Sequence, residues 1–375
     1  NEQANSQARS SWKSFFGKRK LMWIIICIIV VILIIIIPII IIKTKKNNVI
    51  QISTTTTEIT TQEATETLNQ LITEKQIPTK YNNYSQQGIT VAGGNGQGNQ
   101  SNQLGSPGNI IIDENKTILI SDGTNHRIVE WKYESNHSQI IIGGNNQLPR
   151  FNPTDVVVDK ENNALIIVEV ATRQVLRWFR ANQTYQQILT FDFYSIRLAM
   201  DKNGYLYVSN YDQKDVTRWK DGDTSGTIVA GGGGGEGNDL NHLETPGCIF
   251  VDDDYSVYVS DEANSRVMKW KKDATEGIIV AGGNEYGDNL DQLSLPLGVI
   301  VDRMGNIYVA DWFNHRIMRW REEDTRGSIV VGGNGEGSAS NQLNVPTRLA
   351  FDNEENLYVV DQNNRRVQKF EKSSD

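Results

Sequence analysis

The amino-acid sequence predicts an all-β protein, a six-bladed β-propeller with four-stranded blades, preceded by one transmembrane helix. Three observations support the propeller. A unit of roughly fifty residues recurs six times in the chain. Each unit contains four short apolar or alternating runs separated by Gly, Asn and Asp, which is the pattern of four antiparallel strands. The sixth unit ends before its fourth run, and a matching run stands ahead of the first unit.

The element expected first is the membrane span. Leu21–Ile42 is a run of 22 residues without a charged side chain. As a helix it is long enough to cross a hydrocarbon core of about 30 Å. Five Lys or Arg residues precede the run and three follow it, which favours residues 1–20 as a cytoplasmic tail. We therefore expect a single-pass type II membrane protein with its propeller extracellular or luminal.

A tether is expected between the span and the propeller, over residues 43–83. This stretch is rich in Ser, Thr, Glu and Gln and has too few apolar residues to bury a core. Ser/Thr-rich stalks beside a membrane are often O-glycosylated, and a plain disordered linker has the same composition. The sequence leaves both readings open.

Two positions mark every repeat of the propeller, expected over residues 84–375. An aspartate closes the first run, at Asp113, Asp159, Asp201, Asp252, Asp302 and Asp352. An aromatic residue closes the third run, at Trp131, Trp178, Trp219, Trp270, Trp320 and Phe370. Too few residues follow Phe370 for another strand. We therefore expect Gly88–Gly94 to complete the last blade, which closes the ring without a free edge.

The segments Asp122-x-x-Asn125-His126-Arg127 and Asp311-x-x-Asn314-His315-Arg316, each followed by Ile and a Trp, resemble NHL repeats. The connector Gly-Gly-Asn-Gly-x-Gly, followed by Asn-Gln-Leu and Pro, resembles that family as well. The resemblance covers residues 84–370 and implies a propeller used mainly as a binding platform. Members include RNA-binding domains of tripartite-motif proteins, sensor domains of membrane kinases and the lyase of peptide amidation.

The charge distribution argues against nucleic acid as a partner. The chain carries a net charge of -8. Residues 1–50 hold eight Lys or Arg and one Glu, a balance of +7, which leaves -15 for residues 51–375. An acidic propeller is poorly suited to a phosphate backbone. The remaining partners are a protein, a peptide or a glycan.

Polar residues near the start of each first strand are the main candidates for a site. The position four before the first aspartate is variable, whereas the positions one and three before it are apolar. Strand alternation therefore directs the variable side chain toward one mouth of the central channel. These side chains either form a binding site or only solvate the channel. The position carries Asn109, Asp155, Arg197, Cys248, Gly298 and Arg348.

The second and third repeats depart from the Asp-x-x-Asn-x-Arg pattern, through drift or through specialisation for a ligand. Specialisation would place a site beside Arg173, Arg197, Tyr211 and Lys214. In the fifth repeat an aromatic pair either anchors a partner or packs on a neighbouring loop. The candidate binding residues are Asn109, Asp155, Arg173, Arg197, Tyr211, Lys214, Trp312, Phe313 and Arg348.

No catalytic constellation, metal site or cofactor site is predicted. The repeated Asp, Asn and Arg are expected to build turns, because a scaffold residue is needed in every blade and a catalytic residue only once. His126 and His315 share one repeat position with Arg, Lys and Ser, which cannot all bind a metal. The leading hypothesis is a membrane-tethered binding or sensing module. The alternative is a peptidyl-amidoglycolate lyase-like enzyme, for which the family implies a His-bound metal and disulfides.

Overall fold

The computed structural model describes residues 84–144, 151–191, 196–234 and 237–373. No helix within these ranges has the length and apolar character of a membrane span. The predicted cytoplasmic tail, span and tether fall in residues 1–83, outside the described part of the chain. The prediction of a transmembrane segment at Leu21–Ile42 therefore stays a prediction.

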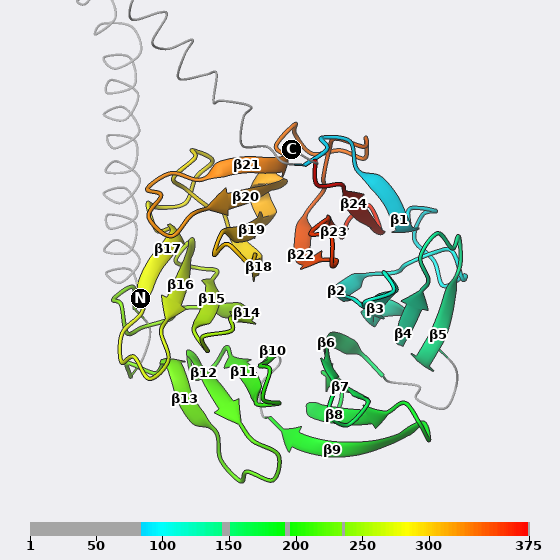
Figure 1. The fold of residues 1–375 in the computed structure, drawn as a ribbon, viewed down its shortest axis with the longest axis horizontal. Helices are drawn as coiled ribbons and strands as arrows, with labels where there is room; N and C mark the ends of the chain where they lie inside the picture. Colours follow the sequence, from blue (N-terminus) through cyan, green and yellow to red (C-terminus); the bar gives the residue numbers. More distant parts are fainter. Residues whose placement is uncertain (1–83, 145–150, 192–195, 235–236, 374–375) are drawn as a thin grey trace, which may run out of the picture. The chain divides into compact units, whose positions relative to one another are not determined.

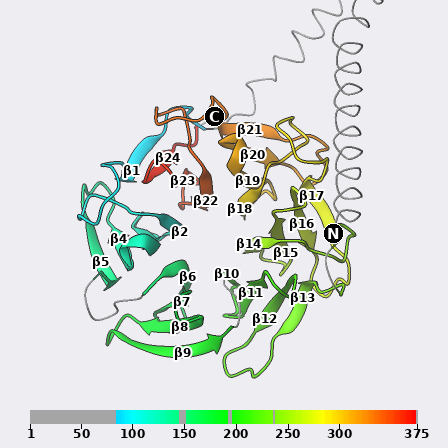
Figure 2. The ribbon, with the colours of Figure 1, turned by 180° about the vertical axis from the view of Figure 1, so that it is seen from behind.

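The described residues form six four-stranded antiparallel sheets, which confirms the predicted six-bladed β-propeller. Figures 1 and 2 show the blades arranged around a common centre, with the first strand of each blade innermost. We number the blades in chain order. Blade 1 contains β2 (Pro107–Ile112), β3 (Ile118–Asp122), β4 (Arg127–Trp131) and β5 (Ser138–Gly143). Blade 2 contains β6 (Pro153–Asp159), β7 (Ala164–Glu169), β8 (Gln174–Phe179) and β9 (Thr184–Thr190).

Blades 3 to 5 repeat this order. Blade 3 contains β10 (Ile196–Met200), β11 (Leu206–Asn210), β12 (Asp215–Trp219) and β13 (Thr227–Gly231). Blade 4 contains β14 (Pro246–Val251), β15 (Val257–Asp261), β16 (Arg266–Trp270) and β17 (Ile278–Gly282). Blade 5 contains β18 (Pro296–Val301), β19 (Ile307–Asp311), β20 (Arg316–Trp320) and β21 (Ser328–Gly332). Short 3₁₀ turns, η3 (Gly123–Asn125) and η4 (Trp312–Asn314), join the second and third strands of blades 1 and 5.

Blade 6 is built from both ends of the propeller sequence. Its inner strands are β22 (Pro346–Phe351), β23 (Leu357–Asp361) and β24 (Arg366–Phe370). The fourth strand is β1 (Ile89–Gly93), which pairs antiparallel with β24. The predicted closure by residues 88–94 is confirmed. Because β1 occupies the edge of β24, the ring is joined by backbone hydrogen bonds between its first and last strands.

The hydrophobic core lies between neighbouring blades. Each buried cluster combines side chains from two adjacent sheets, as in the cluster that joins Ile120 of β3 to Val360 of β23. The aromatic residue that closes the third strand belongs to this packing, since Trp131, Trp270, Trp320 and Phe370 are all at most 2% exposed. The repeat of aromatics in the sequence therefore reflects the packing of one blade on the next.

Glycine pairs end the fourth strands because the chain turns there with positive φ. Gly93 has a φ of 70°, and a Cβ atom at this position would stand 2.2 Å from the carbonyl oxygen of Arg365. An L-residue with a side chain would be strained in this conformation and would clash with that backbone. Equivalent pairs recur at Gly143, Gly144, Gly231, Gly232, Gly282, Gly283, Gly332 and Gly333.

Candidate functional site

The repeated Asp, Asn and Arg residues tie each second strand to the connector that leads into its blade. In blade 5, Arg316 Nε donates to Asp311 Oδ2 at 2.7 Å, and Asn314 Nδ2 donates to the same oxygen at 2.9 Å. The Arg316 guanidinium also donates to three connector carbonyls, those of Asp288, Asn289 and Gln292. The same arrangement recurs in blades 1, 4 and 6. As expected from the sequence, this set of residues builds the scaffold.

The position just before the motif arginine, or before the residue that replaces it in blades 2 and 3, has a left-handed conformation in every blade. The φ angle lies between 50° and 59° at all six positions: His126, Arg173, Lys214, Ser265, His315 and Arg365. This conformational requirement explains why chemically unrelated residues share the position. The two histidines turn toward the next blade, where His126 Nδ1 lies 2.7 Å from the carbonyl oxygen of Phe151.

Blades 2 and 3 replace this network differently. In blade 2, Glu169 accepts hydrogen bonds from the backbone N–H groups of Asn152, Ala171 and Thr172. Neither blade keeps the ion pair of the motif: Gln174 stands in the arginine position of blade 2, and blade 3 has Asn210 in the aspartate position and Asp215 in the arginine position. Asp215 is 7% exposed, and burial raises the pKa of its carboxyl to about 6.

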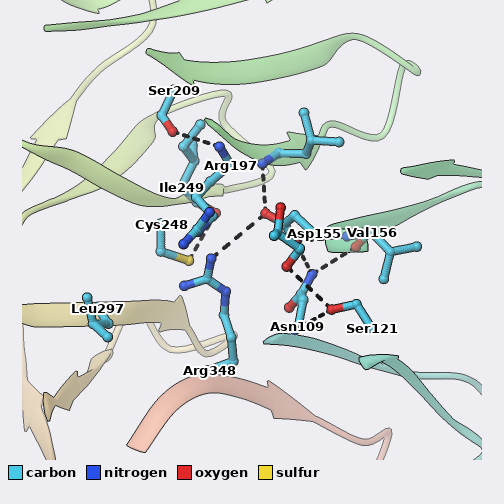
Figure 3. A network of polar contacts seen from close by, with 12 residues as sticks. Asn109, Ser121, Asp155, Val156, Arg197, Ser209, Cys248, Ile249, Leu297 and Arg348 are labelled. Carbon is cyan, nitrogen blue, oxygen red and sulfur yellow. Dashed lines mark hydrogen bonds and ion pairs between the residues drawn. The ribbon is translucent and has the colours of Figure 1, made fainter. Parts of the chain in front are cut away.

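The inner-strand residues predicted at the channel converge at one mouth (Figure 3). Asp155 is the centre of this group and is 2% exposed. Its Oδ1 accepts hydrogen bonds from Asn109 Nδ2 and from the backbone N–H of Val156. Its Oδ2 accepts from the backbone N–H of Leu198 at 3.0 Å and lies 3.9 Å from Arg348 Nη2. One carboxylate therefore links blades 1, 2, 3 and 6.

A cavity of about 450 Å³ opens above this group on the face that carries the turns between second and third strands. We call it the channel pocket. Three residues predicted from the sequence line it: Arg197 from β10, Arg348 from β22 and Trp312 from η4. The sequence did not identify three others that line the same pocket, Thr154, Glu262 and Thr347. The volume is in the range of small-molecule sites.

The charges in the channel pocket act on one another. Burial, followed by repulsion from Arg348, lowers the pKa of Arg197. Burial would lower the pKa of Arg348 as well, but the nearby acidic groups Cys248, Asp155 and Glu262 raise it. Burial raises the pKa of Glu262, against the opposing effect of both arginines. Two guanidinium groups thus share a small volume with a carboxyl group that gives up its proton less readily than usual.

The other predicted residues lie elsewhere on the propeller. Arg173, Tyr211 and Lys214 do not line the channel pocket. The ammonium group of Lys214 lies 4.7 Å from the centre of the Tyr211 ring and donates to the carbonyl of Glu244. Phe313 is 55% exposed and packs edge-on against Tyr286, with ring centres 6.1 Å apart. Asn109 and Asp155 lie beneath the pocket in the group centred on Asp155.

Comparison with known proteins supports the fold. No family model and no curated protein sequence matches the chain. An auxiliary nutrient binding protein from Bacteroides thetaiotaomicron is similar in structure, with a TM-score of 0.59, 14% identity and coverage of 76% of each chain. A gluconolactonase from Xanthomonas campestris has a TM-score of 0.53 and 14% identity over 72% of this chain and 87% of its own. At these identities the similarity establishes the six-bladed propeller alone.

Proposed function

We propose that this protein is a membrane-tethered ligand-binding module of the NHL-repeat type, and that its binding site is the channel pocket. The observation that carries the proposal is the convergence of Arg197, Arg348 and Trp312 on one cavity of about 450 Å³. These residues come from three different blades, so the ring brings them together although they are far apart in sequence. The tether and the outward-facing propeller rest on the apolar run Leu21–Ile42.

Binding, rather than turnover, is the function that this pocket supports best. A guanidinium pair and an aromatic wall give charge and shape recognition. A catalyst would also need a nucleophile or a general base placed against the reacting atoms, and we assign Glu262, the carboxyl group that lines the pocket, to recognition of the ligand. The structural similarity to a protein described as nutrient-binding is consistent with a small ligand. A macromolecular partner would instead use the exposed aromatic residues around Phe313.

Thermal unfolding of the full chain, kept in a mild detergent, tests the proposal. A ligand that binds only the folded state raises the melting temperature in proportion to its occupancy. The chain is screened against neutral sugars, small acids, amines and short peptides. Trp312→Ala removes a wall of the pocket. Its matched control is Phe313→Ala, which removes the neighbouring exposed ring.

We expect at least one compound to stabilise the wild type and the Phe313→Ala variant, and to lose its effect in the Trp312→Ala variant. Stabilisation that depends on Phe313 and not on Trp312 would move the site to the outer surface. Metal-dependent turnover of a hydroxyglycine peptide would favour the lyase alternative and contradict a module that only binds.

A further inference from the structure

The channel pocket contains hydrogen-bonding groups that the protein itself leaves unused. Thr347 lines the pocket and is 6% exposed, yet its hydroxyl has no hydrogen-bond partner among the described residues. Thr154 also lines the pocket, and its hydroxyl is likewise without a partner in the described part of the chain. A buried hydroxyl without a partner is costly, so two of them beside one cavity indicate that a ligand completes the hydrogen bonding.

Arg348 also retains donors for a ligand. A guanidinium group has five N–H donors. Within the described residues, Arg348 makes one long hydrogen bond, from Nη1 to the carbonyl oxygen of Thr347 at 3.5 Å. Its contact with Asp155 is 3.9 Å long, beyond hydrogen-bond distance. The side chain is 7% exposed, so solvent does not take up this capacity freely.

The acidic groups nearby do not neutralise the guanidinium pair completely. The Asp155 carboxylate already accepts hydrogen bonds from Asn109, Val156 and Leu198. Burial raises the pKa of Glu262, so its carboxyl ionises less readily than an exposed one and opposes a bound anion less. The repulsion that lowers the pKa of Arg197 is relieved when an anion sits between the two guanidinium groups.

We propose that the channel pocket binds a small carboxylic acid, whose carboxylate lies between Arg197 and Arg348 and whose apolar body packs against Trp312. This inference rests on the proposed function and adds the chemical class of the ligand. Guanidinium groups match a carboxylate in geometry and charge. A monoanion is favoured over a dianion such as a phosphate monoester, because the Asp155 carboxylate limits the positive charge of the site. Leu295 and Leu297 extend the apolar wall beside Trp312.

Cys248 provides a reporter inside the channel. Cys248 is half-buried, and its sulfur lies near the Arg348 guanidinium (Figure 3). Iodoacetate and iodoacetamide alkylate a thiol by the same displacement: the thiolate sulfur forms the new carbon bond, iodide leaves and the thiol proton goes to solvent. The two reagents differ in that the first carries a carboxylate and the second a neutral amide. Their rate ratio at Cys248 therefore measures the attraction of the site for a carboxylate.

The experiment measures this ratio on the full chain, by mass spectrometry of the peptide that contains Cys248. The denatured chain gives the reference ratio for the same thiol without its surroundings. We expect the folded chain to favour iodoacetate by about tenfold or more relative to this reference. Arg348→Gln should return the ratio to the reference value, and Arg348→Lys should keep part of the preference. Phenylacetate should protect Cys248 from iodoacetate, whereas phenylacetamide and phenyl phosphate should protect less.

The competition with phenylacetate uses the wild-type chain, so the test does not depend on the folding of a variant. Equal ratios in folded and denatured chains, together with equal stabilisation of the chain by phenylacetate and phenylacetamide, would overturn the inference. If neither iodoacetate nor iodoacetamide reaches Cys248, the inference is tested by melting temperature alone. In that case equal stabilisation of the chain by phenylacetate and phenylacetamide would overturn it. A neutral ligand whose binding depends on Trp312 would then leave the proposed function standing and remove only its carboxylate specificity.

Discussion

The guanidinium of Arg348 in blade 6 lies 3.9 Å from the carboxylate of Asp155 in blade 2. These two blades are not neighbours in the ring, since blade 1 stands between them. Asp155 also accepts hydrogen bonds from Asn109 of blade 1 and from the backbone of blade 3. These polar contacts beneath the channel pocket therefore form a cross-link among blades 1, 2, 3 and 6, which include blades that are not neighbours in the ring.

This cross-link leads to a prediction about stability. Asp155→Asn replaces a buried carboxylate that accepts several N–H groups and removes one of the acidic neighbours of Arg348. We expect the free energy of unfolding to fall by about 2–4 kcal/mol, because the amide has one acceptor oxygen where the carboxylate has two, so a buried N–H group of Val156 or Leu198 loses its acceptor and Arg348 loses a nearby negative charge. Urea titration followed by tryptophan fluorescence measures this change.

Asp253→Asn is the matched control for the Asp155 variant, since Asp253 is exposed on the turn between β14 and β15. It should change the free energy of unfolding by less than about 0.5 kcal/mol. An Asp155 variant as stable as this control would show that the interblade contacts do not contribute to holding the ring together.

The repeated motif gives a second prediction. Arg316→Ala removes the partner of Asp311, which is 0% exposed, together with three hydrogen bonds to connector carbonyls. We expect a loss of about 3–5 kcal/mol in the free energy of unfolding. Arg321→Ala, at a neighbouring exposed arginine, serves as the control. An equal effect of the two substitutions would contradict a structural role for the motif ion pair.

The sequence was sufficient to predict the blades, because every blade needs the same turn, the same packing aromatic and the same innermost strand. It also placed Arg197 and Arg348 at the channel, because strand alternation is a local property. Glu262 was missed, although it follows the second-strand Asp261 just as Trp312 follows Asp311. Thr154 and Thr347 were missed because they lie next to the channel position, where alternation predicts the opposite face. The contact between Arg348 and Asp155 was missed because it depends on how far each side chain reaches across the channel, which a repeat pattern does not specify.

Blade 3 gives a prediction about the dependence of stability on pH. Burial raises the pKa of Asp215 from its ordinary value of 3.8 to about 6 in the folded chain. The folded state therefore binds the Asp215 proton more tightly than the unfolded state. The associated stability is fully present below the unfolded pKa and is lost as the pH rises through about 6.

Asp215→Asn should remove this loss and stabilise the protein above pH 6 by about 1–2 kcal/mol, with little change near pH 4. Unfolding titrations at several pH values measure the difference. The double variant Asn210→Asp, Asp215→Arg restores the ion pair of the other blades and should be more stable than either single variant. Additive effects of the two single substitutions would argue against a pair at this position.

Glu262 gives a prediction about binding. Burial raises the pKa of its carboxyl above the usual 4.5, while Arg197 and Arg348 lower it and Asp261 raises it. Protonated Glu262 is neutral and ionised Glu262 repels an anion. The affinity of the channel pocket for phenylacetate should therefore fall as the pH rises through the pKa of Glu262. Calorimetric titration across this range measures the fall, and phenylacetamide, which has no charge, should show none.

The substitution Glu262→Gln separates this effect from a general loss of structure at higher pH. The variant keeps a group of the same size beside Arg197 but cannot ionise, so its affinity for phenylacetate should stay constant through the range in which the wild type weakens. Glu276→Gln, on the exposed turn between β16 and β17, should behave as the wild type does. A Glu262→Gln variant that weakens with pH as the wild type does would assign the titration to another group. It would then remove Glu262 from the recognition of the carboxylate.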